Sequence, residues 1–143
     1  MKGIINYVCG FMFSLDMKRV ALIEKLKPEF QKNKFNGIGG KIEEYDLDEY
    51  DSMIREFEEE TGVKTFKTDW IKTVVYVGPN YDYEVHFFMC ISDKIDKIKQ
   101  VEKEKPIIVN VNELYKYPTL YNINWLVPIS LDKNILKPIY IYE

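Results

Sequence analysis

Residues 39–43 read GGKIE and residues 55–63 read REFEEETGV, and the segment that joins them decides the fold of this 143-residue chain. Apolar residues recur in it at three- and four-residue spacing, so they fall on one side of a helix. These apolar residues are Leu47, Tyr50, Ile54 and Phe57. We therefore predict a helix over residues 48–61, with Gly62 as its C-terminal cap.

The predicted helix and the residues that lead into it are strongly acidic. Residues 43–60 contain ten acids and one base, Arg55, which gives a net charge of −9 against −3 for the whole chain. Acids packed this densely repel one another, and a divalent cation would remove that cost. Glu56, Glu59 and Glu60 share one arc of about 100° around the helix. They can converge on a hard cation such as Mg²⁺, although a solvated acidic surface is an equal alternative.

These segments together resemble the Nudix box, which reads Gly, five residues, Glu, seven residues, then Arg-Glu-apolar-X-Glu-Glu-X-Gly-apolar. The second half of the pattern matches at every specified position from Arg55 to Val63. In the first half, Asp46 stands where the box has Glu, and one extra residue separates it from Arg55. These departures concern the role of Asp46 and leave Glu59 and Glu60 in register.

The resemblance implies a metal site and a specific role for each residue around it. The implied metal ligands are the carboxylates of Glu56, Glu59 and Glu60 and the carbonyl of Gly39. The expected cation is Mg²⁺, with Mn²⁺ as a substitute, and Arg55 would orient the carboxylates. Such ions bridge phosphate oxygens and make a bound water nucleophilic. Glu56 is the first choice for the general base, and Glu102 or Glu104 would supply an acid from outside the box.

The remaining chain predicts strands on both sides of the acidic helix. The expected strands are 4–14, 19–26, 70–77, 83–91, 107–111 and 139–142, with loops over 27–41 and 93–105 and a short helix over 122–131 interrupted by Pro128. Hairpins before and after a central helix favour a mixed sheet covered by helices. We therefore expect an α+β protein with the Nudix fold, an α/β/α sandwich around a mixed β-sheet, in a single domain over 1–143.

A wider resemblance concerns the substrate. Residues 34–41, 85–88 and 122–128 look like the branch of the family that hydrolyses oxidised purine nucleoside triphosphates. By this resemblance Asn36 and Asn122 would bind the base, because an amide both donates and accepts, and Lys41 would bind phosphate. A turn role for Asn36 and a helix N-cap role for Asn122 remain alternatives. Phe30, Phe35 and Trp125 either stack on a base or belong to the core.

The sequence favours a hydrolase that cleaves a nucleoside triphosphate to the monophosphate and pyrophosphate. The alternatives are cleavage of nucleoside diphosphate derivatives, such as ADP-ribose or dinucleoside polyphosphates, and a silent module that only binds a nucleotide.

The net charge of −3 gives no reason to expect a nucleic-acid polymer as a partner. The chain has no apolar run that suits a bilayer, and Cys9 and Cys90 suit reduced core thiols of a cytoplasmic protein. His86, the one histidine, favours a structural role, and the sequence leaves the oligomeric state open.

Overall fold

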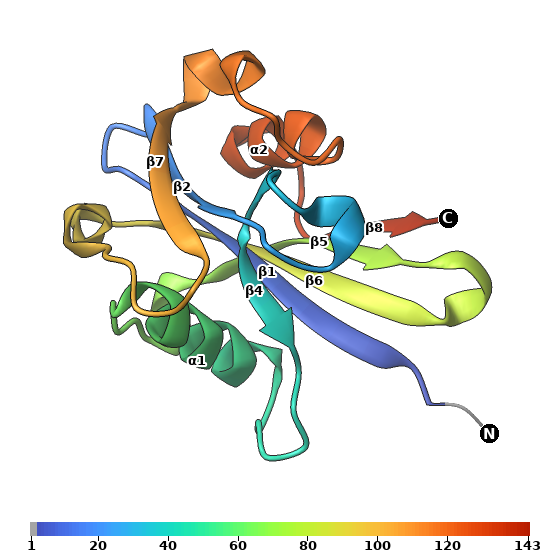
Figure 1. Ribbon diagram of the computed structural model, residues 1–143. Helices are drawn as coiled ribbons and strands as arrows, with labels where there is room; N and C mark the ends of the chain where they lie inside the picture. The colour runs from blue at the N-terminus through green and yellow to red at the C-terminus, as the bar shows by residue number, and fades with distance from the viewer. Residues whose placement is uncertain (1–2) are drawn as a thin grey trace.

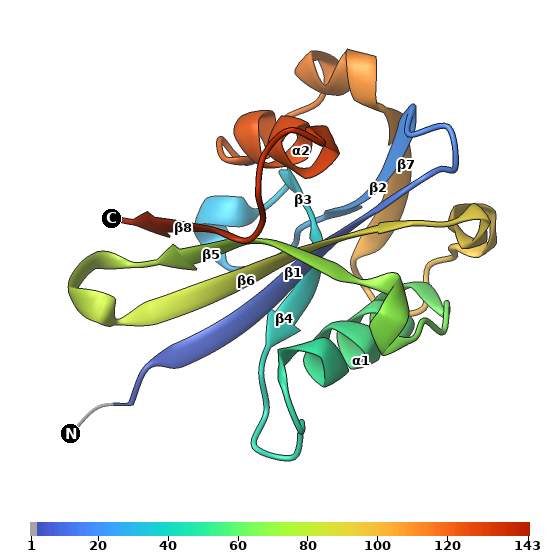
Figure 2. The same cartoon turned by 180° about the vertical axis from the view of Figure 1, so that it is seen from behind.

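The computed structural model describes residues 3–143 as a mixed β-sheet between two α-helices (Figures 1 and 2). The strands are β1 (Ile5–Phe13), β2 (Arg19–Glu24), β3 (Phe35–Asn36), β4 (Ile38–Lys41), β5 (Ile71–Val77), β6 (Tyr83–Ile91), β7 (Lys105–Asn110) and β8 (Ile139–Tyr142), and the helices are α1 (Glu49–Thr61) and α2 (Ile123–Leu131). The main strand order is β3-β2-β1-β6-β5-β8, with β4 paired to β1 and β7 paired to β2. The β1–β6 and β5–β8 pairs are parallel and the other pairs are antiparallel.

Strand β1 organises the sheet because it has three partners. It runs parallel to β6 along its whole length, while its C-terminal half pairs with β2 and its N-terminal half pairs with β4. The pairing with β4 sets Gly39 opposite Cys9. A Cβ added at Gly39 would lie 1.9 Å from the carbonyl oxygen of Val8, so this close approach requires glycine. The acidic segment is thereby brought to the edge of the sheet.

Successive side chains of β1 point to opposite faces of the sheet and build two cores. Cys9, Phe11 and Phe13 belong to the core on the α2 side. Val8 and Met12 belong to the core on the α1 side. Figure 1 shows α1 and α2 on opposite sides of the sheet. The sandwich expected from the sequence is therefore confirmed.

Local chemistry fixes both ends of α1. The side chain of Asp48 accepts a hydrogen bond from the Asp51 N–H at 2.9 Å, which caps the N-terminus. Gly62 has a φ of 75° and donates its N–H to the carbonyl oxygen of Glu58 at 2.8 Å. The helix predicted over 48–61, with Gly62 as its C-terminal cap, is confirmed to within one residue.

The prediction that Leu47 shares the buried face of this helix is wrong. Leu47 is 91% exposed, whereas Phe57 is fully buried with its ring edge toward Trp70. Leu47 precedes the N-cap, where the backbone is extended, so helical periodicity does not apply to it. Tyr50 and Ile54 are partly buried against the same core.

Three other predictions need correction. The loop expected over 27–41 contains β3, which pairs with β2, and β4, which pairs with β1. The loop expected over 93–105 begins with a 3₁₀ helix, Asp93–Lys97, that is anchored by the fully buried Ile95. Pro128 does not interrupt α2, which runs through it from Ile123 to Leu131. A proline inside a helix lacks the N–H donor and crowds the carbonyl four residues earlier, and the packing of this apolar helix on the sheet compensates for that cost. None of the helices within residues 3–143 combines the length and apolar character needed to cross a membrane.

Replacement of Phe57 by alanine should lower the free energy of unfolding by about 3–5 kcal/mol, because it leaves a cavity under α1. Leu47→Ala is the matched control and should change it by no more than about 0.5 kcal/mol. Urea denaturation followed by circular dichroism measures both. Equal losses for the two variants would contradict the packing of α1 described above.

Candidate active site

The glycines of β4 lie directly against α1. A Cβ added at Gly40 would lie 2.5 Å from Oε1 of Glu56, so the carboxylate fills the space that a side chain would need. Gly39 precedes it in the same strand and Lys41 follows it. The GGK segment and the glutamates of the helix, separated by more than a dozen residues in sequence, therefore share one site.

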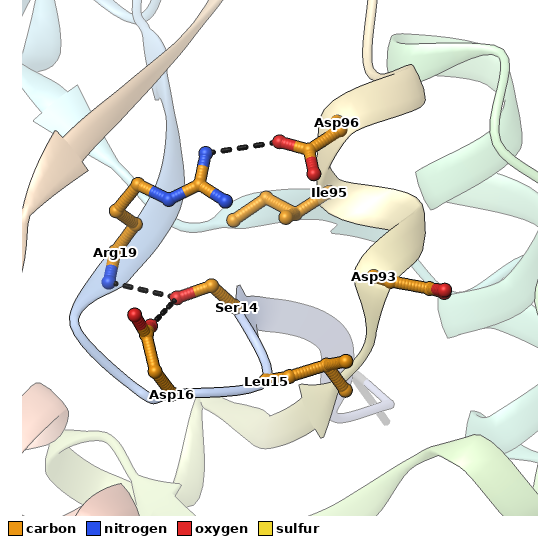
Figure 3. A pocket seen from close by; sticks show the side chains of 7 residues that line it. All are labelled: Ser14, Leu15, Asp16, Arg19, Asp93, Ile95 and Asp96. Carbon is orange, nitrogen blue, oxygen red and sulfur yellow. Dashed lines mark hydrogen bonds and ion pairs between the residues drawn. The ribbon is translucent and has the colours of Figure 1, made fainter.

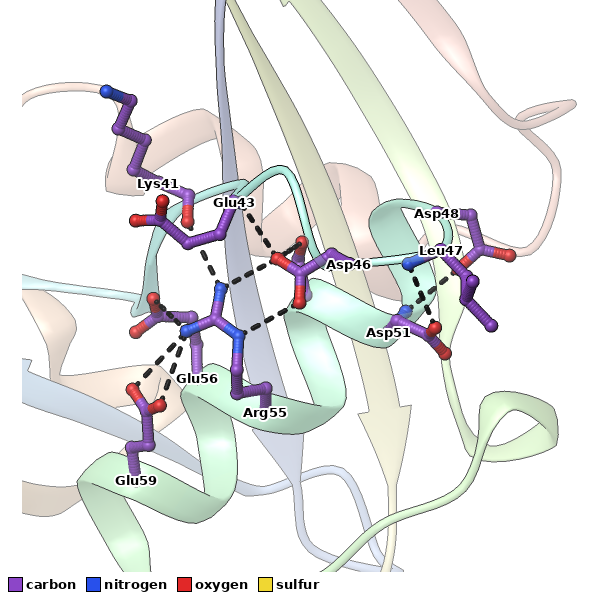
Figure 4. A network of polar contacts seen from close by, with 10 residues as sticks. Lys41, Glu43, Asp46, Leu47, Asp48, Asp51, Arg55, Glu56 and Glu59 are labelled. Atoms are coloured by element: carbon purple, nitrogen blue, oxygen red, sulfur yellow. Dashed lines mark hydrogen bonds and ion pairs between the residues drawn. The ribbon is translucent and has the colours of Figure 1, made fainter.

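Arg55 is the centre of a polar network at this site (Figure 4). Its Nη1 donates to Oε1 of Glu56 at 3.0 Å and to both carboxylate oxygens of Glu59 at 3.4 Å. Its Nη2 donates to the backbone carbonyl oxygen of Lys41 at 3.3 Å. One guanidinium thus positions two of the implied ligands and ties α1 to the end of β4.

Asp46 provides the firmest contact of Arg55. The Nε and Nη2 atoms of Arg55 donate to Oδ1 and Oδ2 of Asp46 at 3.0 and 2.8 Å. Asp46 also accepts from the Ser52 hydroxyl at 2.6 Å and from the Glu43 N–H at 2.9 Å. The hydrogen bonds from Arg55 hold the pKa of Asp46 well below its usual range. The shorter side chain and the extra residue in the loop therefore still allow a two-pronged ion pair with Arg55.

A second group of carboxylates surrounds Glu60. Burial, together with the negative charges of Glu102 and Glu104, raises the pKa of Glu60 to about 7. Burial is also the first cause that raises the pKa of Glu56, where Arg55 opposes the shift. The Oε2 atom of Glu60 is buried and has no hydrogen-bond partner among residues 3–143. A buried carboxylate oxygen without a donor is an acceptor that suits a cation.

The two acids from outside the box differ in their contacts. Glu104 accepts hydrogen bonds from Lys25 Nζ at 2.9 Å and from the Leu26 N–H at 2.7 Å, so it anchors the end of β2. Glu102 is exposed, and its charge acts on both Glu56 and Glu60. Glu104 is therefore held by hydrogen bonds to the chain after β2, whereas Glu102 acts on the glutamates of α1 without comparable hydrogen bonds among residues 3–143.

Within the part of the chain that the structure describes, no three His, Cys, Asp or Glu side chains are arranged to hold a metal ion as they stand. Arg55 binds Glu56 and Glu59, which turns both carboxylates toward it. The chemistry of the site nevertheless fits a hard cation, because Glu60 keeps a buried oxygen without a partner among residues 3–143, and its acidic neighbours Glu56 and Glu102 offer further carboxylate oxygens.

A pocket of about 790 Å³ adjoins the glycines of β4. Asn36, Lys41 and Asn122, the three residues expected to bind substrate, all line it. So do Cys9 and Lys25. Because Lys25 also binds Glu104, it links the pocket to the acidic group. A volume of this size suits a nucleotide-sized ligand.

The two asparagine amides differ in their hydrogen bonding. Asn36 Oδ1 accepts from the Gly37 N–H at 2.8 Å, and its Nδ2 donates to Oε1 of Gln31 at 3.4 Å. Asn122 occupies the N-cap position of α2, but its side chain makes no capping hydrogen bond. Its Oδ1 is buried without a partner among residues 3–143. The capping alternative for Asn122 therefore lacks its hydrogen bond, and this oxygen is available to a ligand.

The aromatic candidates separate into pocket and core. Phe30 is 71% exposed and lines the pocket, as does the partly buried Trp125. Phe35 is buried in the core beside Tyr117. Cys9 was not predicted to line the pocket, because that depends on which face of β1 carries its side chain.

Other groups singled out from the sequence lie elsewhere. Cys90 is a buried free thiol. His86 is partly buried, and burial lowers its pKa, in keeping with a neutral structural residue. A smaller cavity of about 210 Å³ lies near Ser14 and Asp96 (Figure 3). There Arg19 binds Asp96 at 3.0 Å and Ser14 donates to a carboxylate oxygen of Asp16 at 2.6 Å, so these polar groups satisfy one another.

Comparison with known proteins identifies the fold. No protein-family model matches the chain, and no curated protein matches its sequence. A MutT structure from work on Aliivibrio salmonicida and Vibrio cholerae has a TM-score of 0.70 at 20% identity, over 90% of this chain and 97% of that one. The Nudix domain of Shewanella oneidensis NrtR, crystallised with ADP ribose, gives 0.71 at 13% identity, over 91% and 88% of the two chains. A Nudix hydrolase from Nitrosomonas europaea gives 0.72 at 13% identity, over 100% and 81%.

The class defined by these comparisons is the Nudix fold. The chain therefore has the α+β Nudix fold that its sequence led us to expect, with a mixed sheet. The similarity covers nine-tenths or more of the chain in all three of these structures, with the Nudix-box residues at the edge of the sheet beside α1.

Replacement of Asp46 by alanine should lower the free energy of unfolding by about 1.5–3 kcal/mol, because it removes hydrogen bonds to a charged group. Asp46→Glu restores the charge and should recover much of this loss. Glu44→Ala, which removes an exposed acid of the same loop, should change stability by no more than about 0.5 kcal/mol. Chemical denaturation compares the three variants. A loss no larger for Asp46→Ala than for Glu44→Ala would show that the Arg55 network does not stabilise the loop.

Replacement of Glu60 by glutamine should raise the melting temperature of the metal-free protein by about 3 °C or more, because it removes a buried charge that faces other acids. Glu58→Gln is the matched control, since Glu58 is an exposed glutamate of the same helix. Differential scanning calorimetry measures both. A melting temperature that is unchanged or lower in Glu60→Gln would show that this carboxylate is already compensated.

Proposed function

We propose that this protein is a magnesium-dependent Nudix pyrophosphohydrolase that cleaves a nucleoside triphosphate to the monophosphate and pyrophosphate. The observation that carries the proposal is the buried carboxylate oxygen of Glu60, which has no hydrogen-bond partner among residues 3–143. Glu60 lies on the same helix as Glu56, whose carboxylate lies against Gly40 in the lining of a nucleotide-sized pocket. We place the reaction in the cytoplasm, since Cys9 and Cys90 are buried as free thiols.

The cation would be held by the oxygen donors at the edge of the sheet. The proposed ligands are the carboxylates of Glu56, Glu59 and Glu60 and the carbonyl of Gly39. An all-oxygen donor set favours Mg²⁺, with Mn²⁺ as a substitute. When bound, the cation offsets the charge of the phosphate oxygens and lowers the pKa of a coordinated water. It would also relieve the repulsion between Glu60 and its acidic neighbours.

The side chains of the chain then have distinct tasks. Glu56 accepts a proton from the attacking water as the new phosphorus–oxygen bond forms and the anhydride bond breaks. Arg55 keeps Glu56 and Glu59 oriented through its hydrogen bonds at 3.0 and 3.4 Å. Pyrophosphate leaves without a covalent enzyme intermediate. Glu102 is the second candidate for the base, because it faces the same carboxylates from the other side.

The pocket would select the nucleotide. Lys41 and Lys25 line it and supply positive charge for the phosphates. Asn122 offers its unpartnered Oδ1 to a donor on the base. Asn36 uses its Oδ1 for the backbone of Gly37 and one Nδ2 proton for Gln31, so the second Nδ2 proton is the donor that it offers to the base. One acceptor and one donor suit a purine edge, and an oxidised purine deoxynucleotide is the first substrate to test.

A nucleoside diphosphate derivative is the second candidate, and two observations favour it. The NrtR Nudix domain was crystallised with ADP ribose. The pocket volume of about 790 Å³ also accommodates more than one ring system. A silent nucleotide-binding module is less well supported, because such a module has no need of the buried charge at Glu60.

A panel of nucleotides, assayed with and without Mg²⁺ for released pyrophosphate and monophosphate, tests the proposal. We expect triphosphates to yield pyrophosphate only with the metal. Glu56→Gln should lower kcat by about 10²–10⁴-fold, which is the usual contribution of a general base. Glu59→Gln should also lower turnover strongly, whereas Glu58→Gln should leave it unchanged. Full turnover of Glu59→Gln with Mg²⁺ would refute the metal-site assignment.

A further inference from the structure

One wall of the pocket is held by a residue remote from the Nudix box. Tyr76 of β5 and Tyr83 of β6 line the pocket, and their hydroxyls both donate to Oε2 of Glu143, at 2.5 and 3.4 Å. Their rings are stacked, with centroids 6.4 Å apart and planes 25° apart. A single carboxylate therefore joins two neighbouring rings.

The backbone holds this carboxylate in place. Strand β8 pairs with β5 as the last strand of the main sheet path (Figure 2), with Val77 opposite Tyr142. The Glu143 N–H continues the pairing by donating to the carbonyl oxygen of Val77 at 3.0 Å. Glu143 is thereby anchored next to Tyr76, although its own side chain lies at the exposed edge.

The ring of Tyr83 also packs against the backbone at Gly78. A Cβ added at Gly78 would lie 2.3 Å from Cε1 of Tyr83, so the ring packs directly on the backbone of the turn. Stacking on Tyr76 and the bond to Glu143 restrict it on two other sides. The ring is therefore fixed before any ligand arrives.

The hydrogen bonds decide what the wall offers to a ligand. Each tyrosine hydroxyl can donate one hydrogen bond, and Glu143 accepts the hydrogen bonds of both. The bond to Glu143 raises the pKa of Tyr76 to about 12, so that hydroxyl keeps its proton at neutral pH. The wall thus presents ring surface rather than donors, and polar recognition is left to Asn36 and Asn122 of the same pocket.

We propose that Glu143 is a positioning residue: it holds Tyr76 and Tyr83 as a preformed aromatic wall against which the planar base of the nucleotide packs. The proposal rests on the proposed function, because it takes this pocket as the nucleotide site. Aromatic rings pack well on planar ligands, and rings that are already ordered spare the ligand the entropic cost of ordering them. Glu143 contributes to binding of the base and does not take part in hydrolysis.

Steady-state kinetics with the best substrate of the nucleotide panel tests this role. Glu143→Ala should raise KM about tenfold, from the cost of ordering two side chains on binding, with kcat within about twofold of the unaltered protein. Glu143→Gln retains an acceptor for the hydroxyls and should restore most of the affinity. Glu113→Ala, which also removes an exposed carboxylate, is the control and should leave KM unchanged.

A double-mutant cycle separates positioning from a general loss of stability. The variant Tyr76→Phe should raise KM by itself, and its effect should largely disappear in the Glu143→Ala background, because both changes break the same bond. Melting temperatures are measured for all variants. An unchanged KM in Glu143→Ala, or additive effects of the two changes, would overturn the proposal.

Binding of a nucleotide with a methylene bridge in place of the scissile anhydride oxygen distinguishes the two proposals. Isothermal titration calorimetry should give about tenfold weaker binding to Glu143→Ala than to the unaltered protein. Equal binding to both would refute the role of Glu143 and leave the proposed function standing. Absence of binding to the unaltered protein would overturn both.

Discussion

The contact between α1 and β4 exists because residue 40 has no side chain. The carboxylate of Glu56 fills that space, and a Cβ there would lie 2.5 Å from its oxygen. The neighbouring Gly39 allows β4 to pair closely with β1. A Cβ at residue 40 would therefore displace the Glu56 carboxylate from its place against β4, and a Cβ at residue 39 would clash with the backbone of β1. The two glycines thus set the position of β4 and of the Glu56 carboxylate.

Electrostatics sets the second condition. Burial, together with the acids of the segment before β7, raises the pKa of Glu60 to about 7, which is a cost to the folded protein. Arg55 offsets part of it through its ion pairs with Asp46, Glu56 and Glu59. Lys25 pairs with Glu104 in the second group, whereas Glu60 keeps a buried oxygen without a hydrogen-bond partner among residues 3–143. Such an arrangement is typical of a functional site rather than of a solvated helix surface.

The carboxylates proposed for hydrolysis and the pocket proposed for nucleotide binding lie on different faces of the sheet. The glutamates lie on the α1 side, whereas the pocket with Asn122 and the tyrosine wall lies on the α2 side. Strand β4 is where they meet, because its glycines contact Glu56 and also line the pocket. Lys25 reinforces the connection by lining the pocket while it binds Glu104. A ligand in the pocket is therefore next to the acidic group without entering the core.

Features that depend on local interactions could be predicted from the residues alone. The periodicity of α1, its C-terminal cap at Gly62 and the shared arc of its glutamates follow from helix geometry, which repeats within a few residues. The box pattern also predicted the fold, which the solved structures confirm. Two predictions from local rules were wrong. Leu47 lies before the start of α1, so helical periodicity does not apply to it, and Pro128 lies inside α2, where packing outweighs its low helix propensity.

The construction of the pocket depends on long-range contacts that could not be predicted from the residues alone. Cys9, Tyr76, Tyr83 and Glu143 meet through pairing between strands far apart in sequence, and no local pattern encodes which strands become neighbours. The same holds for the choice between Glu102 and Glu104, which depends on the bond from Lys25. The departure at Asp46 likewise became interpretable only when its two-pronged contact with Arg55 was visible. Long-range contacts of this kind follow from the packing of the whole chain, so residue types and spacing alone do not determine them.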